Sequence, residues 1–150
     1  EIVLLMTADG HVYNQRTAER LSQFEHIIII CGHYEGFDER IRKYVDLEIS
    51  IGDFILTGGE LAAMIIADSV GRLITGVLKT GVTDSESFSH VTMDGKRLLE
   101  YPHYTKPQIF EDDSVPDILL SGNHSEIEKW RREKSLEKTK LIRPDLLKDH

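Results

Sequence analysis

The fold is decided by residues 26–60, which read HIIIICGHYEGFDERIRKYVDLEISIGDFILTGGE. The first part of this stretch, residues 26–31, holds four consecutive isoleucines with no polar residue between them. Such a run is typical of a parallel strand covered by helices, so we expect both of its faces to be buried. We expect an amphipathic helix over residues 38–45 and a second strand over residues 47–50 to follow.

The segments on either side extend this pattern. Residues 2–6 are apolar and predict a strand, Ala8-Asp9-Gly10 predicts a turn, and residues 14–24 predict a helix with one apolar face. Thr57 and Glu60 have the spacing of a capping box and predict a helix that continues to about Leu73. Strands and helices alternate, which indicates an α/β fold with a parallel sheet.

The rest of the chain differs in character. Residues 79–97 are rich in Ser, Thr, Asp and Gly, which predicts a linker or mobile loop. Asn123 with Glu126 is a second candidate capping box, and its helix is expected to run to about Lys138 and to stop before Arg143-Pro144. We therefore predict three parts, over residues 1–78, 79–97 and 98–150.

The composition favours a cytoplasmic protein that does not enter a membrane. Of the 150 residues 40% are hydrophobic, and no apolar run approaches the ~18 residues that a membrane span needs. The first residues form no basic leader, and the single Cys31 has no partner for an internal disulfide. The first residue is Glu, which is typical of a fragment or of a processed chain.

The charge is unevenly distributed along the chain. Residues 129–143 carry seven basic side chains against two acidic ones, a local charge of +5, which leaves −13 for the rest of a chain of net charge −8. An acidic protein is a poor general nucleic-acid binder, but this basic segment offers a local footprint for phosphates. A solvated helix with ordinary charge pairs explains the same residues equally well.

Two loops are candidates for a ligand site. The first, CGHYEGFDER at residues 31–40, follows a strand directly, and the second, ISIGDFILTGGE at residues 49–60, mixes glycines with apolar residues. Ligands of parallel sheets bind at the carboxyl ends of the strands, and glycines let the backbone approach a ligand closely. The chain has no dinucleotide-binding or P-loop motif and no cluster of Cys and His with zinc spacing, so we predict no metal site.

These and later motifs resemble the bacterial tRNA (guanine-N1)-methyltransferase family. The resemblance is carried by CGHYEGFDER, EISIGDFILTGGELAAM, GVL, ESFS, LLEYPHYTKP, VPDILLSGNHSEIEKWRR and RPDLL, which span nearly the whole chain. It implies a SPOUT α/β domain with a deep trefoil knot, a flexible linker and a small, mainly helical C-terminal domain that binds tRNA. The family's N-terminal portion, with a first strand and a Gly-rich segment, is absent from this sequence.

The resemblance also implies the reaction and its residues. The family uses S-adenosylmethionine to methylate N1 of the guanine that lies 3′ of the tRNA anticodon, and it works as a homodimer whose subunits share each active site. Arg72 matches the catalytic arginine. The basic segment 129–143 is expected to bind tRNA through Lys129, Arg131, Arg132 and Lys134. By matching position the cofactor pocket is lined by Leu5, Met6, Gly32, Tyr34, Glu35, Ile51, Gly52, Phe54, Leu56, Gly58 and Gly59.

The chain departs from the family pattern at a few positions. The first knot loop reads Met6-Thr-Ala-Asp-Gly10 where the family has Leu-Ser-Pro-Gln-Gly, and Thr75 stands where Pro is common. Glu86 precedes Ser-Phe where the family has its Asp base, so Glu86 is assigned as the base with Asp84 in reserve. The alternatives are a related SPOUT methyltransferase of another base or of a ribose 2′-hydroxyl, and a non-catalytic RNA-binding module. Any need for Mg²⁺ is not readable from these residues.

Overall fold

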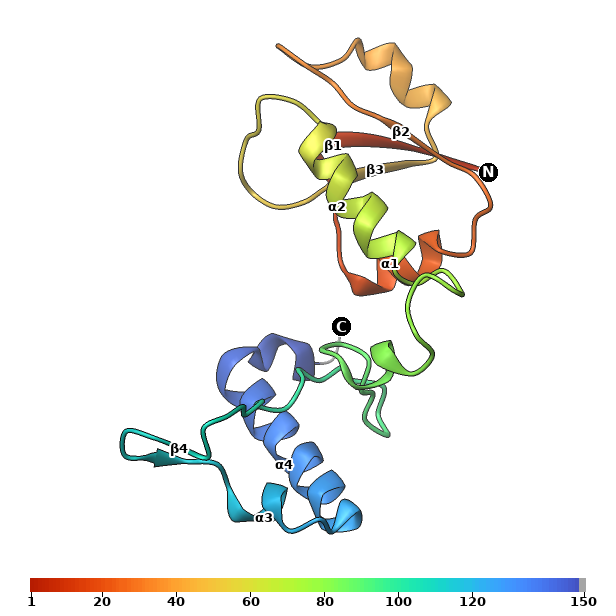
Figure 1. Ribbon diagram of the computed structural model, residues 1–150. Coiled ribbons are helices and arrows are strands. Elements are labelled where there is room, and N and C mark those ends of the chain that lie inside the picture. The colour runs from red at the N-terminus through yellow and green to blue at the C-terminus, as the bar shows by residue number, and fades with distance from the viewer. Residues whose placement is uncertain (149–150) are drawn as a thin grey trace. The chain divides into compact units, whose positions relative to one another are not determined.

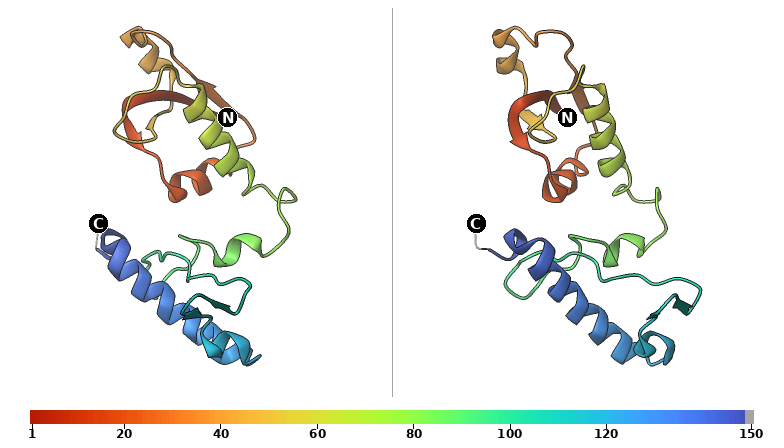
Figure 2. Two further views of the ribbon diagram at one scale, coloured as in Figure 1. Left: turned by 60° about the vertical axis from the view of Figure 1, so that its left-hand side comes forward. Right: turned by 90° about the vertical axis from the view of Figure 1, so that its left-hand side faces the viewer.

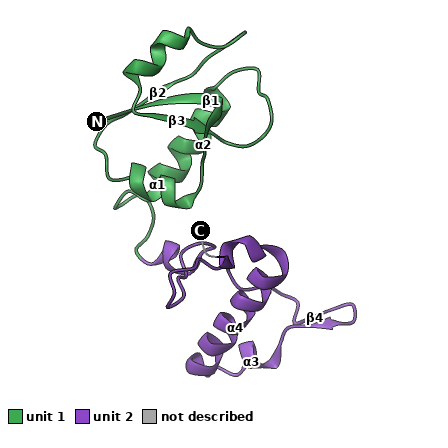
Figure 3. Ribbon diagram, turned by 180° about the vertical axis from the view of Figure 1, so that it is seen from behind, with its two compact units in different colours: residues 1–80 green, residues 81–150 purple. Residues whose placement is uncertain are grey.

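The computed structural model describes residues 1–148 and divides the chain into two compact units, residues 1–80 and residues 81–150 (Figure 3). The division falls after Thr80. The three-part division with a flexible linker over residues 79–97 stays a prediction.

Unit 1 is built on a three-stranded sheet in the order β2-β1-β3. The central strand β1 (Ile2–Val12) pairs in parallel with both β2 (Ile27–Ile30) and β3 (Leu47–Ser50). Along the chain these strands alternate with the helices α1 (Gln15–Leu21), η1 (Glu39–Tyr44) and α2 (Glu60–Gly71). The predicted α/β architecture with a parallel sheet is confirmed.

The core lies between the sheet and the two α-helices. Alternate residues of β1, namely Ile2, Leu4 and Met6, point to one side and are buried against α1 and α2. On α2 the buried residues recur every four positions, at 62, 66 and 70, so one stripe of the helix faces the sheet. Figures 1 and 2 show α1 and α2 together on one side of the sheet, with η1 apart from them.

One expectation for residues 26–31 was wrong. The isoleucine strand β2 lies at an edge of the sheet, and its Ile28 is 47% exposed. The strand that is buried on both faces is the central β1, where Leu4 and Leu5 are buried. The helix expected over residues 38–45 is present, and it is the 3₁₀ helix η1. Asp38 starts this helix by accepting a hydrogen bond from the Arg40 N–H, and Val45 ends it in an extended conformation.

The predicted turn at Ala8-Asp9-Gly10 was also wrong, because β1 continues through it. The strand changes register between Met6 and His11, and His11 and Val12 then pair with the end of β3. Gly10 permits this, since a Cβ there would lie 2.6 Å from the backbone carbon of Glu48 and the backbone nitrogen of Ile49. The turn-forming residues therefore produce a bulge in the strand.

Of the two predicted helix caps, one is absent and one is present. The Thr57–Glu60 capping box does not form: Gly59 precedes α2 and no side chain caps the helix. The Asn123 cap is confirmed, because its side chain accepts a hydrogen bond from the Glu126 N–H at 3.4 Å. The helix it starts, α4 (His124–Ile142), runs beyond the predicted end near Lys138 and stops at Arg143, as the following Pro144 requires.

Unit 2 consists of α4 and short elements around it. These are η2 (Val82–Ser85), the antiparallel pair β4 (Ile109–Phe110) and β5 (Asp113–Ser114), α3 (Asp117–Leu120) and η3 (Pro144–Leu147). Ile127, Ser135 and Thr139 are the buried residues of α4. None of the helices within residues 1–148 combines the length and the apolar character that crossing a membrane requires.

The close approach of Gly10 to β3 predicts that a side chain there is not tolerated. Gly10→Ala should lower the free energy of unfolding by roughly 1–3 kcal/mol, the usual cost of overpacking. The matched control is Gly71→Ala at the end of α2, where a Cβ would meet nothing within 4 Å. Urea unfolding of the full-length protein measures both. If Gly10→Ala is as stable as Gly71→Ala, β1 does not pack on β3 as described.

Candidate active site

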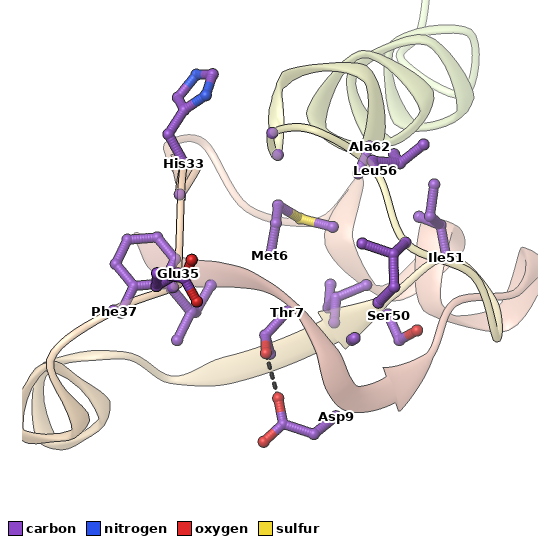
Figure 4. Close-up of a pocket in the computed structure, with 18 of the residues that line it drawn as sticks. Met6, Thr7, Asp9, His33, Glu35, Phe37, Ser50, Ile51, Leu56 and Ala62 are labelled. Atoms are coloured by element: carbon purple, nitrogen blue, oxygen red, sulfur yellow. Dashed lines mark hydrogen bonds between the residues drawn. The ribbon is translucent and has the colours of Figure 1, made fainter.

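A cavity of about 430 Å³ opens beside the carboxyl ends of the strands in unit 1. Three segments form its walls: residues 5–9 of β1, the loop after β2, and the end of β3 with the loop that follows. Figure 4 shows Met6 between the segment that carries His33 and the one that carries Leu56. The strand register places the three segments together, because Leu5 of β1 pairs with Ile30 at the end of β2 and Met6 pairs with Ile49 near the end of β3.

The two loops that follow β2 and β3 are joined directly. Residues His33 and Gly58 form an antiparallel bridge, and the Gly59 N–H donates to the Gly32 carbonyl at 3.0 Å. A Cβ on Gly59 would lie 2.9 Å from the Cα of Cys31. The absence of a side chain at Gly59 therefore lets the loops touch along their backbones.

Glycine also shapes the cavity wall at residue 32. A Cβ on Gly32 would lie 2.4 Å from the Phe37 ring, which covers this backbone. Residue Gly52 has a φ of 145°, and its missing side chain leaves room for the Phe54 ring. Aromatic rings thus lie against bare backbone on two sides of the cavity.

A side-chain hydrogen bond joins the same loops on the outside. The His33 ring is hydrogen-bonded to the Glu60 carboxylate at the start of α2. Hydrogen bonding to its own backbone and to His33 lowers the pKa of Glu60. Burial, with a smaller effect of Glu60, raises the pKa of the neighbouring Cys31 thiol. Cys31 packs against the hydrophobic core, which makes it a packing residue here.

Arg42 of η1 ties three segments together at the edge of the cavity. Its guanidinium forms ion pairs with Asp9 at 2.8 Å, with Glu39 at 2.9 Å, and with Glu48 of β3. Asp9 also accepts a hydrogen bond from the Thr7 hydroxyl (Figure 4). These contacts, that of Thr7 first, hold the pKa of the Asp9 carboxyl below its usual value.

All of the predicted cofactor residues line this cavity. They come from all three segments and are Leu5, Met6, Gly32, Tyr34, Glu35, Ile51, Gly52, Phe54, Leu56, Gly58 and Gly59. Sequence reasoning missed further lining residues, among them Thr7, Asp9, Phe37 and Arg42. The polar segment Thr7-Ala-Asp9 directly after an apolar strand was the available signal for the first two. Nothing in the sequence singled out Arg42.

The predicted catalytic residues lie outside the cavity. Arg72 is half-buried at the C-terminal end of α2 in unit 1, whereas Glu86 is half-buried after η2 in unit 2. Asp84 is an exposed residue of η2. The two predicted catalytic residues thus belong to different units of the chain.

The predicted RNA-binding residues lie together on α4. Lys129 and Arg132 are exposed, and Arg132 pairs with Glu128 at 3.6 Å. Lys134 pairs with Glu137 at 2.6 Å, which raises its pKa. The guanidinium of Arg131 lies 4.7 Å from the centre of the Tyr101 ring. The ordinary helix pairs expected of a solvated helix are thus present in this segment.

Comparison with known proteins assigns the chain to a family. The family model for tRNA (Guanine-1)-methyltransferase TrmD matches residues 1–149. The chain belongs to the TrmD family. Among its curated relatives, the tRNA (guanine-N(1)-)-methyltransferase of Malacoplasma penetrans is 57% identical over 96% of this chain and 61% of its own length.

Other TrmD relatives are similarly close. The tRNA (guanine-N(1)-)-methyltransferase of Desulfitobacterium hafniense is 54% identical over 96% of this chain and 53% of its own length. That of Clostridium botulinum is 51% identical over 99% of this chain and 60% of its own length. The chain thus spans between 53% and 61% of the length of these three relatives. The family resemblance inferred from the motifs is confirmed.

The lowered pKa of Asp9 predicts a pH-dependent stability. The ionised carboxylate contributes fully above the ordinary Asp pKa of about 3.9, and this contribution is lost as the pH falls through the lowered pKa of the folded state. Asp9→Asn should therefore lower the midpoint of thermal unfolding at neutral pH, and the difference from wild type should shrink below about pH 4. Calorimetry at a series of pH values measures this.

The control is Asp53→Asn, which changes an exposed carboxylate outside the Arg42 cluster. It should show a smaller difference from wild type at neutral pH. Equal effects of the two variants at all pH values would contradict a special role for the Asp9 charge.

Proposed function

We propose that the full-length protein methylates N1 of a guanine in the tRNA anticodon loop, at the guanosine 3′ of the anticodon, with S-adenosylmethionine as the methyl donor. The observation that carries this proposal is the cavity at the strand ends, where all eleven matched cofactor positions meet. Membership of the TrmD family and the names of its relatives supply the reaction.

The cavity wall fits a cofactor with a flat ring and a charged chain. Gly32 and Gly52 line the cavity with backbone alone, against which the Phe37 and Phe54 rings pack, and Ile51 and Leu56 give apolar surface for an adenine ring. The Glu35 carboxylate also lines the cavity, and it suits a positively charged amino group or sulfonium. When bound, S-adenosylmethionine supplies an activated methyl group.

Two residues of the chain are proposed to remove the proton from guanine and to stabilise the negative charge that develops. N1 of guanine carries a proton, and we assign its removal to the Glu86 carboxylate as general base. Loss of this proton moves negative charge onto O6, which the forked guanidinium of Arg72 is suited to stabilise. Single-stranded anticodon loops expose such a base at lower cost than a duplex does.

We also propose the family's knotted SPOUT topology and a homodimer for this protein. The outward face of α2 supports the dimer, because Leu61, Met64 and Ile65 lie on it at i, i+3 and i+4 spacing and Met64 is 65% exposed. An apolar face of this kind on a surface helix is typical of an interface between subunits. A site shared between subunits then lets Glu86 of one chain serve Arg72 of the other.

The basic residues of α4 are proposed to hold tRNA phosphates. Arg132 and Lys134 have partners on their own helix, and those exposed pairs contribute little and exchange readily for phosphate. The proposed substrate places the protein in the cytoplasm.

The direct test is methyl transfer from labelled S-adenosylmethionine to tRNA, with the product nucleoside identified as 1-methylguanosine. Glu86→Gln should lower kcat by roughly 10²–10⁴-fold, the usual contribution of a general base, with cofactor binding unchanged. Asp84→Asn, two residues away in η2, is the matched control and should stay within a few-fold of wild type. A fully active Glu86→Gln protein would remove Glu86 from the mechanism.

The sharing of the site between subunits is tested with mixed dimers. Arg72→Ala subunits should be nearly inactive alone, as should Glu86→Gln subunits. A mixed dimer has one site with both residues intact, so activity should partly return. Verified mixed dimers that stay inactive would place both residues in the same chain's site.

The proposed tRNA contacts of α4 predict a change in salt dependence. Replacing Arg131, Arg132 and Lys134 with Ala should weaken tRNA binding and flatten the dependence of log Kd on log salt by about one unit for each lost phosphate contact. Lys43→Ala on η1 of unit 1 is a control that removes a basic residue elsewhere. Filter binding at several salt concentrations measures this, and an unchanged slope would leave α4 as a solvated helix.

A further inference from the structure

The inward stripe of α4 contains two hydroxyl residues where a helix usually buries apolar ones. Thr139 is 0% exposed and Ser135 is 1% exposed, and both are among the most completely buried side chains of the described residues. They lie one helical turn apart, so their hydroxyls face the same neighbouring segment. Buried hydroxyls are costly unless they are hydrogen-bonded, which makes their partners informative.

Both hydroxyls bind the backbone of a single residue, Leu99. Its N–H donates to Oγ1 of Thr139 at 2.9 Å, and its carbonyl accepts a hydrogen bond from the Ser135 hydroxyl. The Thr139 hydroxyl in turn donates to the Ser135 carbonyl at 2.7 Å. The two side chains therefore hold Leu99 as a neighbouring strand would, and we name this arrangement the hydroxyl clamp.

The residues beside Leu99 hold the segment that follows Glu86. The Phe88 N–H donates to the Leu98 carbonyl at 2.7 Å, and the Leu98 N–H donates to the His90 carbonyl at 3.0 Å. The Glu100 N–H donates to the Ser87 hydroxyl at 3.0 Å. Peptide groups of an extended chain point alternately to opposite sides, so residues 98–100 bind residues 87–90 on one side and α4 on the other.

Glu86 is attached directly to this paired segment. It ends η2, its carbonyl accepts a hydrogen bond from the Ser89 N–H at 3.1 Å, and Ser87 follows it in the chain. Hydrogen bonds join α4 to Leu99, and others join the adjacent Leu98 to Phe88, two residues after Glu86.

The same stripe of α4 carries Arg131, one turn before Ser135. Its guanidinium stacks on Tyr101, two residues after Leu99. Residues 99–101 therefore lie along the face of α4 that includes a basic residue proposed to bind tRNA.

We propose that Ser135 and Thr139 are positioning residues for the catalytic carboxylate: the hydroxyl clamp fixes residues 86–100 on α4 and so sets where Glu86 can reach. This inference rests on the proposed function, since it takes Glu86 as the base. It links the helix proposed to bind tRNA to the segment proposed to act on the guanine.

The test is Thr139→Val in the full-length protein, which keeps the side-chain shape and removes the hydroxyl. We expect kcat for methyl transfer to fall roughly 10–100-fold, because a displacement of about 1 Å in a catalytic group has costs of this size. The Kd values for tRNA and for S-adenosylmethionine should stay within about twofold, and Thr139→Ser should recover most of kcat because it restores the hydroxyl.

Hydrogen exchange of backbone amides gives a second measurement that does not depend on activity. In Thr139→Val, and in Ser135→Ala should Thr139→Val fold poorly, the amides of Phe88, Leu98 and Leu99 should exchange faster. The control Ser121→Ala removes a hydroxyl that donates to the Ile118 carbonyl at 2.8 Å and accepts from the Asn123 N–H at 3.2 Å, at the end of α4 farthest from Thr139. It should leave kcat and the exchange of these amides unchanged.

The outcomes separate the inference from the proposed function. A folded Thr139→Val protein with wild-type kcat and unchanged exchange of residues 86–100 overturns the clamp while leaving the methyltransferase proposal standing. A parallel loss of kcat and of both affinities marks Thr139 as a general stability residue and also overturns it. If the wild-type protein forms no 1-methylguanosine, the proposed function itself is contradicted.

Discussion

The parallel pairing of β1 with both β2 and β3 is the constraint on which the rest of unit 1 depends. The register sets Leu5 and Met6 of β1 level with the ends of β2 and β3, so residues 5–9 meet the loops that follow β2 and β3 at one edge of the sheet. This brings together the three walls of the cavity, which are distant from one another in the sequence. The close approach of Gly10 to β3 is part of the same constraint, because it lets β1 bulge and still continue along its neighbour.

Ion pairs and close backbone contacts fix the loops around the cavity that the sheet brings together. Arg42 forms ion pairs with Asp9 of β1, with Glu39 of its own helix and with Glu48 of β3, which fixes η1 and residues 7–9 against β3. On the other side of the cavity, Gly59 lets the loop after β3 touch the loop after β2. The hydrogen bond between His33 and Glu60 joins the same two loops. An exposed ion pair contributes little stability alone, so the contribution of these contacts lies mainly in fixing the geometry of the loops.

Unit 2 is organised by a different interaction. Its long helix α4 binds residues 98–100 through buried hydroxyls rather than through apolar packing alone. Hydrogen bonds are directional, so they fix the position of a segment more narrowly than apolar contacts do. This suits a unit that, in the proposed function, must present both phosphate-binding residues and a catalytic carboxylate to one tRNA.

The sequence by itself determined the class of fold, the family and the cavity-lining loops. Apolar runs and their spacing identified the alternating strands and helices, since burial of apolar residues follows local periodicity. The motifs around Gly32 and Gly58 identified the loops of the site. Only the tertiary structure decided that Ala8-Asp9-Gly10 is a bulge, that Ile28 lies at a sheet edge, and that Arg42 joins three segments. It likewise decided that Ser135 and Thr139 are buried. Each of these features depends on which residues distant in sequence lie opposite one another, and no local pattern of residues contains that information.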